Sequence, residues 1–262
     1  YKPPAAMQIG IPRWSPDGGT IAFIGGLMSD QGFIGGDIFS IPAGGGTPRN
    51  LTPGRAASPS SIQWTAPGRL LFTERSGGGT AAVTLDAATG STATLWSGEE
   101  DLHLAGNFPN FAVAGGTSAW IRSSFFRPPE IWAGPVGLWK QVTRVNSGRA
   151  APWGRARSLE WTNEGLRMQG WLLYPKDYSP ERRYPLIVQV HGGPAGSRVS
   201  NWPDTGFDMA IMSGLGYFVF YPNPRGSYGQ GEAFVRANIG DFGGGDLRDI
   251  LAGVDEVARQ AP

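Results

Sequence analysis

Cysteine is absent from this 262-residue sequence, and histidine occurs only twice, at His103 and His191. Without cysteine the chain has no disulfide framework, no thiol nucleophile and no thiolate metal site. Two histidines are too few for a histidine-based metal cluster. The glycine run at 243–245 lacks the Lys-Ser/Thr that a phosphate-binding loop requires. We therefore predict neither a metal centre nor a cofactor.

Excess charge and long apolar runs are also absent. Lysine and arginine number 22 and the acidic residues 21, so the formal net charge is +1. Such a chain has no field that attracts nucleic acid or anionic lipid. No apolar run approaches the roughly 20 residues of a membrane-spanning helix. We expect neither a nucleic-acid nor a membrane partner, and the compartment, cytoplasm or periplasm, stays open.

Glycine and proline are abundant, with 41 and 22 residues, and they separate the short strands of an internal repeat in residues 1–150. Its copies align on Phe23, Phe72 and Trp120, at intervals of about 50 residues. Each copy continues with a second apolar strand and a short third one: 37–41 and 51–52, 82–85 and 95–96, 130–132 and 142–143. Several short strands per unit at this period are typical of β-propeller blades.

The first copy shows the physical logic of the repeat. Ser15-Pro16-Asp17-Gly18 is a tight-turn sequence, because proline presets φ and glycine tolerates positive φ. We expect Trp14 before the turn, and Ile21 and Phe23 after it, to pack between neighbouring blades. The alternative is three unrelated hairpins of a β-sandwich, which the common spacing disfavours. Since propellers close with about 4–8 blades, about three blades predict a cut amino-terminal end.

A different pattern follows a Gly-, Ala-, Pro- and Arg-rich boundary near residues 146–157. It predicts an antiparallel hairpin, a strand buried on both faces, a short helix, a second buried strand and a long amphipathic helix: 158–162 with 166–175, 184–190, 207–215, 217–221 and 246–260. The last helix has Asp246 as its expected N-cap, and its predicted buried face carries Leu247, Ile250, Leu251, Val254, Val257 and Ala258. This order is a βαβ crossover. Together with the turn at 191–194 described next and the family resemblance that follows, it leads to the expected fold class: a partial β-propeller of about three blades (1–150) followed by the N-terminal half of an α/β-hydrolase domain (151–262), truncated before the nucleophile elbow.

The strand at 184–190 ends in His191-Gly192-Gly193-Pro194. Ligands bind at the carboxyl ends of strands in open α/β sheets. In α/β-hydrolases an H-G-G-type turn at this place supplies a backbone N–H to the oxyanion hole. Glycine is needed there because a Cβ would obstruct the approach of the reacting carbonyl.

Three blocks, 184–196, 221–231 and 240–247, in this order after Trp-Ser-Pro-Asp-Gly-type repeats, carry a family likeness. The chain resembles the prolyl oligopeptidase family, particularly its acylaminoacyl-peptidase-like and dipeptidyl-peptidase-like branches. The resemblance implies a serine peptidase of short peptides, whose propeller restricts access to a Ser-Asp-His site. It also implies that Gly193 donates its N–H to the oxyanion. His191 stands where some members place an assisting tyrosine, and the alternative for His191 is a structural role that shapes the turn.

The nucleophile elbow G-x-S-x-G does not occur in this sequence. Its nearest match, 225–229, has Arg225 where the first glycine must be, so Ser227 is not expected to be the nucleophile. In these hydrolases the triad runs Ser, Asp, His along the chain, and both histidines precede any elbow. We therefore predict that no triad residue lies in this chain, that the chain alone is inactive, and that a strand and G-x-S-x-G follow within about 25 residues.

Several other polar residues have two interpretations each. Arg225 and Tyr228 are candidate substrate-binding residues, and Arg225 alternatively holds its loop through hydrogen bonds to carbonyls. Asp241, Asp246 and Asp249 suggest a metal loop, but capping of the following helix explains the last two more simply. His103 is expected in an exposed loop.

Three functions stay open on these grounds. The first is a serine peptidase in the intact protein, and the second is an esterase on the same scaffold. The third is a catalytically silent fragment that binds a peptide or a partner chain. The expected partners are a peptide substrate and the rest of the same polypeptide or a complementary chain.

Overall fold

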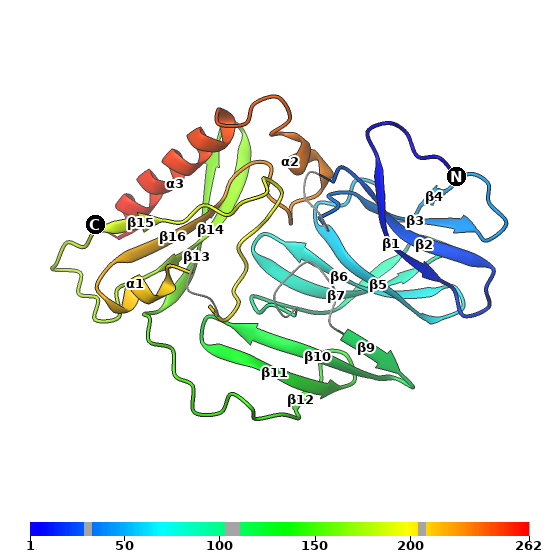
Figure 1. Cartoon of the computed structure of the whole chain (residues 1–262), viewed down its shortest axis with the longest axis horizontal. Coiled ribbons are helices and arrows are strands. Elements are labelled where there is room, and N and C mark those ends of the chain that lie inside the picture. Colours follow the sequence, from blue (N-terminus) through cyan, green and yellow to red (C-terminus); the bar gives the residue numbers. More distant parts are fainter. Residues whose placement is uncertain (29–32, 103–110, 204–207, 262) are drawn as a thin grey trace.

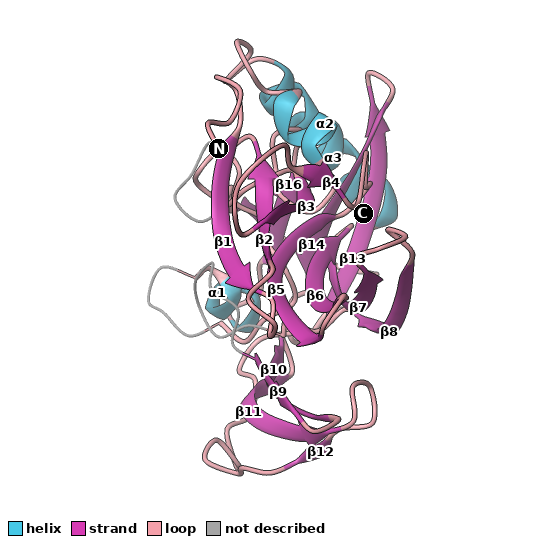
Figure 2. Cartoon of the chain, turned by 90° about the vertical axis from the view of Figure 1, so that its right-hand side faces the viewer, coloured by secondary structure: helices cyan, strands magenta, loops and turns pink. Residues whose placement is uncertain are grey.

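The computed structural model describes residues 1–28, 33–102, 111–203 and 208–261, and the strands of these residues form four open four-stranded sheets (Figures 1 and 2). Three sheets follow one another along the chain, and each is an antiparallel meander. Their strands are β1 (Gln8–Trp14), β2 (Thr20–Gly26), β3 (Asp37–Pro42) and β4 (Arg49–Asn50); β5 (Ser58–Ala66), β6 (Arg69–Ser76), β7 (Gly79–Asp86) and β8 (Thr92–Gly98); β9 (Phe111–Ala114), β10 (Thr117–Ser124), β11 (Arg127–Gly134) and β12 (Lys140–Gln141).

The predicted repeat is confirmed as one sheet per copy. Phe23, Phe72 and Trp120 lie at equivalent places, in the second strand of each sheet, and all three are buried. The short last strands of the first and third sheets begin two residues earlier than predicted. The prediction for Trp14 is wrong. This residue ends β1 at the Ser15–Gly18 turn with 61% of its surface exposed.

Apolar side chains join the neighbouring sheets face to face. One cluster contains Ile24 of the first sheet and Ile62 of the second. A second cluster joins Leu71 of the second sheet to Trp120 and Trp139 near the third. Each such buried side chain contributes about 1.5–3 kcal/mol relative to its exposed state. The three sheets are therefore held as a continuous series rather than as separate hairpins.

The fourth sheet is mixed and has the strand order β13-β14-β16-β15. Its elements are β13 (Ala156–Asn163), β14 (Leu166–Leu173), β15 (Leu186–Val188), β16 (Phe218–Asn223), α1 (Ala210–Gly214), α2 (Glu232–Arg236) and α3 (Gly245–Gln260). The antiparallel hairpin and the parallel pair β15–β16 are confirmed. Among the described residues, no helix has the length and apolarity to cross a bilayer.

β16 is buried throughout because both faces of this sheet are covered. Phe218 and Phe220 face the cluster that includes residues of α3. Val219 and Tyr221, which alternate with them, face a second cluster that also contains Phe125 from the turn between β10 and β11. The second cluster therefore fixes the position of the third sheet against the fourth.

Two other predictions in this region need correction. The strand expected over 184–190 is only three residues long as β15, and it is half-buried because, within the described residues, it pairs on one side only. The helix expected over 207–215 is the five-residue α1, and Phe207 lies outside the described residues. α2 was not predicted.

The helix α3 is confirmed, but the face that it buries is only partly the predicted one, with Val257 common to both. Its buried residues are Gly245, Asp249, Gly253 and Val257, whereas Leu247 and Leu251 are about half exposed. At Gly253 a Cβ would lie 2.9 Å from the rings of Phe220 and Trp161. The missing side chain therefore lets the helix approach the sheet closely, and this close approach decides which face packs.

Candidate active-site region

Two loops meet at the carboxyl ends of the parallel strands β15 and β16. The first, after β15, contains His191, Gly192 and Gly193, and the second, 224–231, follows β16. Parallel strands present their carboxyl ends at the same edge of a sheet. Two loops that are about 30 residues apart along the chain therefore lie side by side, the first partly exposed and the second largely buried, and together they are the candidate active-site region.

Gly193 lies in the exposed part of the first loop, with φ of +137°. This positive φ strains residues with a side chain, so glycine suits both the turn and an open approach to its N–H. His191 Nδ1 lies 3.0 Å from the Gly192 carbonyl oxygen. The structure thus places Gly193 at a solvent-accessible turn, as an oxyanion-hole donor requires, although its catalytic role stays a prediction.

His191 and Ser227 are hydrogen-bonded across the two loops, with 2.8 Å between Nε2 and Oγ. Such a distance is also typical of a nucleophile and its base. Ser227, however, is only 1% exposed, so a substrate has no access to its hydroxyl in this conformation. The sequence had no local signal for this pair, because its members are 36 residues apart. The geometry favours the structural role of His191 over assistance to the oxyanion.

Further hydrogen bonds lock the two loops together. The Tyr228 amide donates to the Gly196 carbonyl at 3.1 Å. Asn223, at the end of β16, accepts from the Arg198 amide at 2.7 Å and donates to the Arg198 carbonyl at 2.9 Å. The first loop is therefore held at His191 and Gly196 by the second loop and at Arg198 by the end of β16.

The second loop is in turn anchored on β5 of the second antiparallel sheet. Ser58 Oγ accepts hydrogen bonds from the amides of Gly229 and Gly231, at 3.0 and 3.2 Å. The Tyr228 hydroxyl donates to the Pro59 carbonyl. Ser58 is fully buried, and burial raises the pKa of Tyr228. The buried hydroxyl of Ser58 and the buried phenol of Tyr228 therefore connect the second antiparallel sheet to the candidate region.

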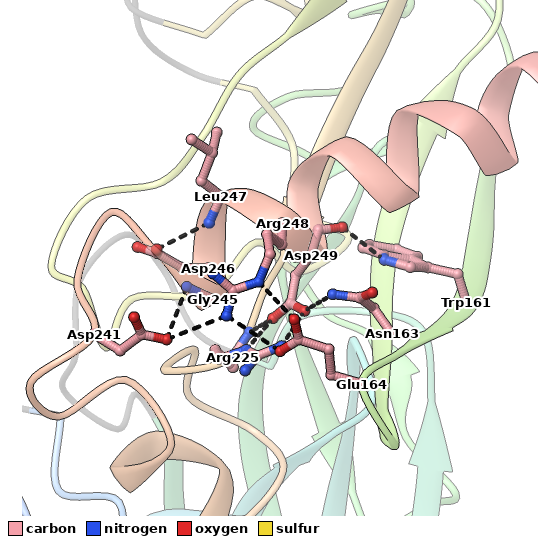
Figure 3. Close-up of polar contacts among 10 residues, drawn as sticks. All are labelled: Trp161, Asn163, Glu164, Arg225, Asp241, Gly245, Asp246, Leu247, Arg248 and Asp249. Atoms are coloured by element: carbon pink, nitrogen blue, oxygen red, sulfur yellow. Dashed lines mark hydrogen bonds and ion pairs between the residues drawn. The ribbon is translucent and has the colours of Figure 1, made fainter.

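Arg225 lies beside these loops at the centre of a network of ion pairs (Figure 3). Its Nε and Nη2 donate to the two carboxylate oxygens of Asp249 at 2.8 and 2.7 Å, and its amide also donates to Asp249 at 3.0 Å. Nη2 lies 2.8 Å from the carboxylate of Glu164, in the turn between β13 and β14. Asn163 donates to Asp249 as well, at 2.8 Å. Arg225 thus connects three elements.

The charges in this network reinforce one another. The hydrogen bond to Asp249 is the main cause that raises the pKa of Arg225 above its usual range. The carboxylate of Glu164 has a lowered pKa because it accepts from Arg248 and, second, from Arg225. The raised pKa of Arg225 and the lowered pKa of Glu164 both favour the ionised forms at neutral pH. The arrangement therefore favours the loop-holding role of Arg225, through carboxylates rather than carbonyls, and its substrate-binding role stays a prediction, like that of Tyr228.

The three aspartates near the glycine run do not gather as metal ligands. Among the described residues no group of His, Cys, Asp and Glu side chains is arranged to hold a metal ion. Asp246 is not the N-cap, because α3 begins one residue earlier with Gly244 at that position, and Asp241 instead accepts from the Gly245 amide at 2.9 Å. Asp249 does not cap α3 either. His103 lies outside the described residues.

Known peptidases are similar to this chain in sequence and in fold. A model of the prolyl oligopeptidase family matches residues 203–261. The chain is 36% identical to the uncharacterized peptidase YuxL of Bacillus subtilis over 141 residues, 52% of this chain and 21% of that protein. It is 26% identical to dipeptidyl-peptidase 5 of Porphyromonas gingivalis over 257 residues, 95% of this chain and 36% of that protein.

The acylaminoacyl peptidase of Pyrococcus horikoshii has a similar fold, with a TM-score of 0.72 at 22% identity. The similarity covers 93% of this chain and 37% of that one. The chain therefore spans only about a fifth to a third of the length of the curated relatives it matches. Residues 203–261 thus match the prolyl oligopeptidase family, the chain is similar in sequence to named peptidases, and its fold is similar to that of an acylaminoacyl peptidase.

Proposed function

We propose that this chain is part of a serine peptidase that hydrolyses short peptides by acyl transfer to serine, with its catalytic triad outside these 262 residues. The observation that supports this most directly is the exposed Gly193 turn at the carboxyl end of β15. The names of the relatives, a dipeptidyl-peptidase among them, favour peptides over other substrates.

In the same proposal, residues 1–150 are a partial β-propeller of about three blades, and residues 151–262 are part of an α/β-hydrolase domain. The side of β15 away from β16 has no paired strand within the described residues. Leu186, Ile187 and Val188 remain half-buried there. A further parallel strand that ends in a nucleophile elbow fits this open edge, and it would place the serine next to Gly193.

In the proposed reaction the serine oxygen attacks the scissile carbonyl while a histidine base takes the serine proton. The carbonyl oxygen becomes negatively charged and accepts hydrogen bonds from the Gly193 N–H and from the amide after the nucleophile. One such donor lowers the barrier by roughly 2.7–4 kcal/mol. Collapse of the intermediate releases the amine product, which takes the proton from the histidine, and water activated by the same histidine then hydrolyses the acyl-enzyme.

A fluorophosphonate probe tests this proposal, because it reacts covalently with activated serines. We expect labelling of a longer polypeptide that includes this chain and no labelling of the 262 residues alone. Labelling of the 262-residue chain would refute the placement of the triad. Absence of labelling in the longer polypeptide would refute the peptidase and the esterase alike and favour a silent, peptide-binding protein. Peptide and ester substrates assayed side by side separate the two enzymes.

A further inference from the structure

The Gly192–Gly193 peptide unit is the group whose orientation matters at the candidate oxyanion hole. In a trans peptide the C=O of one residue and the N–H of the next lie in one plane and point in opposite directions. Whatever holds the Gly192 carbonyl therefore also sets the direction of the Gly193 N–H. In this chain the group next to that carbonyl is His191 Nδ1, at 3.0 Å.

The hydrogen-bond partners of His191 determine which ring nitrogen carries the proton. A carbonyl oxygen only accepts, so the contact with Gly192 requires a proton on Nδ1. In the neutral ring Nε2 is then an acceptor, and the Ser227 hydroxyl, 2.8 Å away, is its donor. The Ser227 hydroxyl therefore supports the Nδ1–H form at Nε2, while the Gly192 carbonyl supports it at Nδ1.

Ser227 itself is rigidly placed. Its amide donates to the Pro224 carbonyl at 3.0 Å, and the preceding Gly226 amide donates to the Phe234 carbonyl at 2.9 Å. Gly226 has φ of +93°, and a Cβ there would lie 2.8 Å from Asn238. The hydroxyl of Ser227 is buried against the ring of His191, so it acts on the ring and not on solvent.

The space around the Gly192 carbonyl is equally restricted. A Cβ on Gly196 would lie 2.5 Å from the Gly192 oxygen and 3.1 Å from His191 Nδ1. Glycine at this position therefore leaves room for the contact between the ring and the carbonyl. The hydroxyl of Ser227 at Nε2 and the absence of a side chain at Gly196, next to Nδ1, are two independent observations.

We propose that Ser227 is a positioning residue, which acts through His191 to hold the Gly192–Gly193 peptide with the Gly193 N–H directed toward the substrate carbonyl. The catalytic meaning of this inference rests on the proposed peptidase function. The geometry itself does not, because the hydrogen bonds lie entirely within the 262 residues. In this view Ser227 matters to an acyl-transfer enzyme without being its nucleophile.

The test uses nuclear magnetic resonance of the ¹⁵N-labelled 262-residue chain. The ring nitrogen shifts of His191 report its tautomer, and His103→Gln assigns the signals because the chain has only two histidines. We expect the Nδ1–H form in the parent chain. A ring protonated on Nε2 at mildly alkaline pH would overturn the proposal without any further variant.

Ser227→Ala is the decisive variant. We expect it to shift the ring of His191 away from the Nδ1–H form, and the order parameter of the Gly193 amide to fall from about 0.85 toward 0.6 or less. Ser227→Thr keeps the hydroxyl and should keep both signals. The matched control is Ser213→Ala, which removes another buried hydroxyl, bonded to the Gly154 amide and the Tyr174 carbonyl. It should leave His191 and Gly193 unchanged.

Besides an Nε2-protonated ring in the parent chain, three outcomes contradict the positioning role: unchanged signals in Ser227→Ala, equal changes in Ser213→Ala, or fluorophosphonate labelling of Ser227. A longer polypeptide that does not react with the probe refutes the peptidase and leaves the tautomer result intact. The two hypotheses therefore fail in distinguishable ways.

Discussion

The substitution Asp249→Asn is the sharpest test of what holds the candidate region together. The Asp249 carboxylate is fully buried in α3 and accepts four hydrogen bonds, three from Arg225 and one from Asn163. An asparagine has nearly the same size, but one of its two terminal atoms is an NH₂ donor. That donor would face N–H groups, and the buried Arg225 would lose the charge that compensates it.

The magnitude follows from the burial of this pair. Breaking a buried ion pair by removing one partner costs about 3–5 kcal/mol, because the other charge stays buried without compensation. Glu164 also contacts Arg225, at 2.8 Å, and compensates part of the charge. We therefore expect Asp249→Asn to lower the free energy of unfolding by about 3 kcal/mol. With a urea dependence of roughly 2 kcal/mol/M, the midpoint shifts by about 1.5 M.

Urea unfolding followed by tryptophan fluorescence measures this shift. Trp161 is a suitable reporter, since its indole N–H donates to the carbonyl of residue 249 itself at 2.8 Å. The matched control is Glu160→Gln, which also changes an acid to its amide but in an exposed pair with Arg167. The control should not move the midpoint measurably. A loss under 1 kcal/mol in Asp249→Asn, or an equal shift in the control, would refute the reasoning.

Three other perturbations have defined outcomes. Ser58→Ala removes the acceptor of two loop amides, so we expect a loss of about 1–3 kcal/mol and faster proteolysis of 224–231; unchanged proteolysis would contradict this anchor. Gly253→Ala, although favourable for an isolated helix, should destabilise by about 1–3 kcal/mol because its Cβ meets Trp161 at 2.9 Å; a higher melting temperature would contradict the close packing. The pKa of Glu256 is lowered to about 2, mainly by Arg259. Its folded pKa lies below the ordinary value of 4.5, so its stabilisation is present above that value and is lost as the pH falls toward 2, and Glu256→Gln should flatten this part of an unfolding curve measured against pH.

Most of the secondary structure follows from local patterns. The strands of the repeat and β16 are recognisable because apolar runs are bounded by glycine- and proline-rich turns, and this punctuation acts over a few residues. The exposed position of Trp14 does not follow from these patterns, because an aromatic residue beside a turn fits an interface and a surface equally well. The length of β15 and the choice of the buried face of α3 do not follow from local patterns either, because they depend on the elements that pack against them.

The candidate region divides in the same way. The turn at Gly193 was recognisable, since H-G-G after a strand is a local feature, while the oxyanion-hole role of Gly193 stays a prediction. The partners of His191 and Arg225 were not, because Ser227 and Asp249 lie 36 and 24 residues further along the chain. No periodicity connects such distant positions.

By itself, the sequence determined the order of the repeat units, the buried strand β16 and the turn at Gly193. Each of these depends on backbone conformation and on apolar spacing within a short window. Only the tertiary structure decided that Ser227 meets His191, that Ser58 anchors the neighbouring loop and that Asp249 faces Arg225. These contacts form because parallel strands bring distant loops to one edge of a sheet, where buried donors and acceptors must find partners or lose their hydration without compensation.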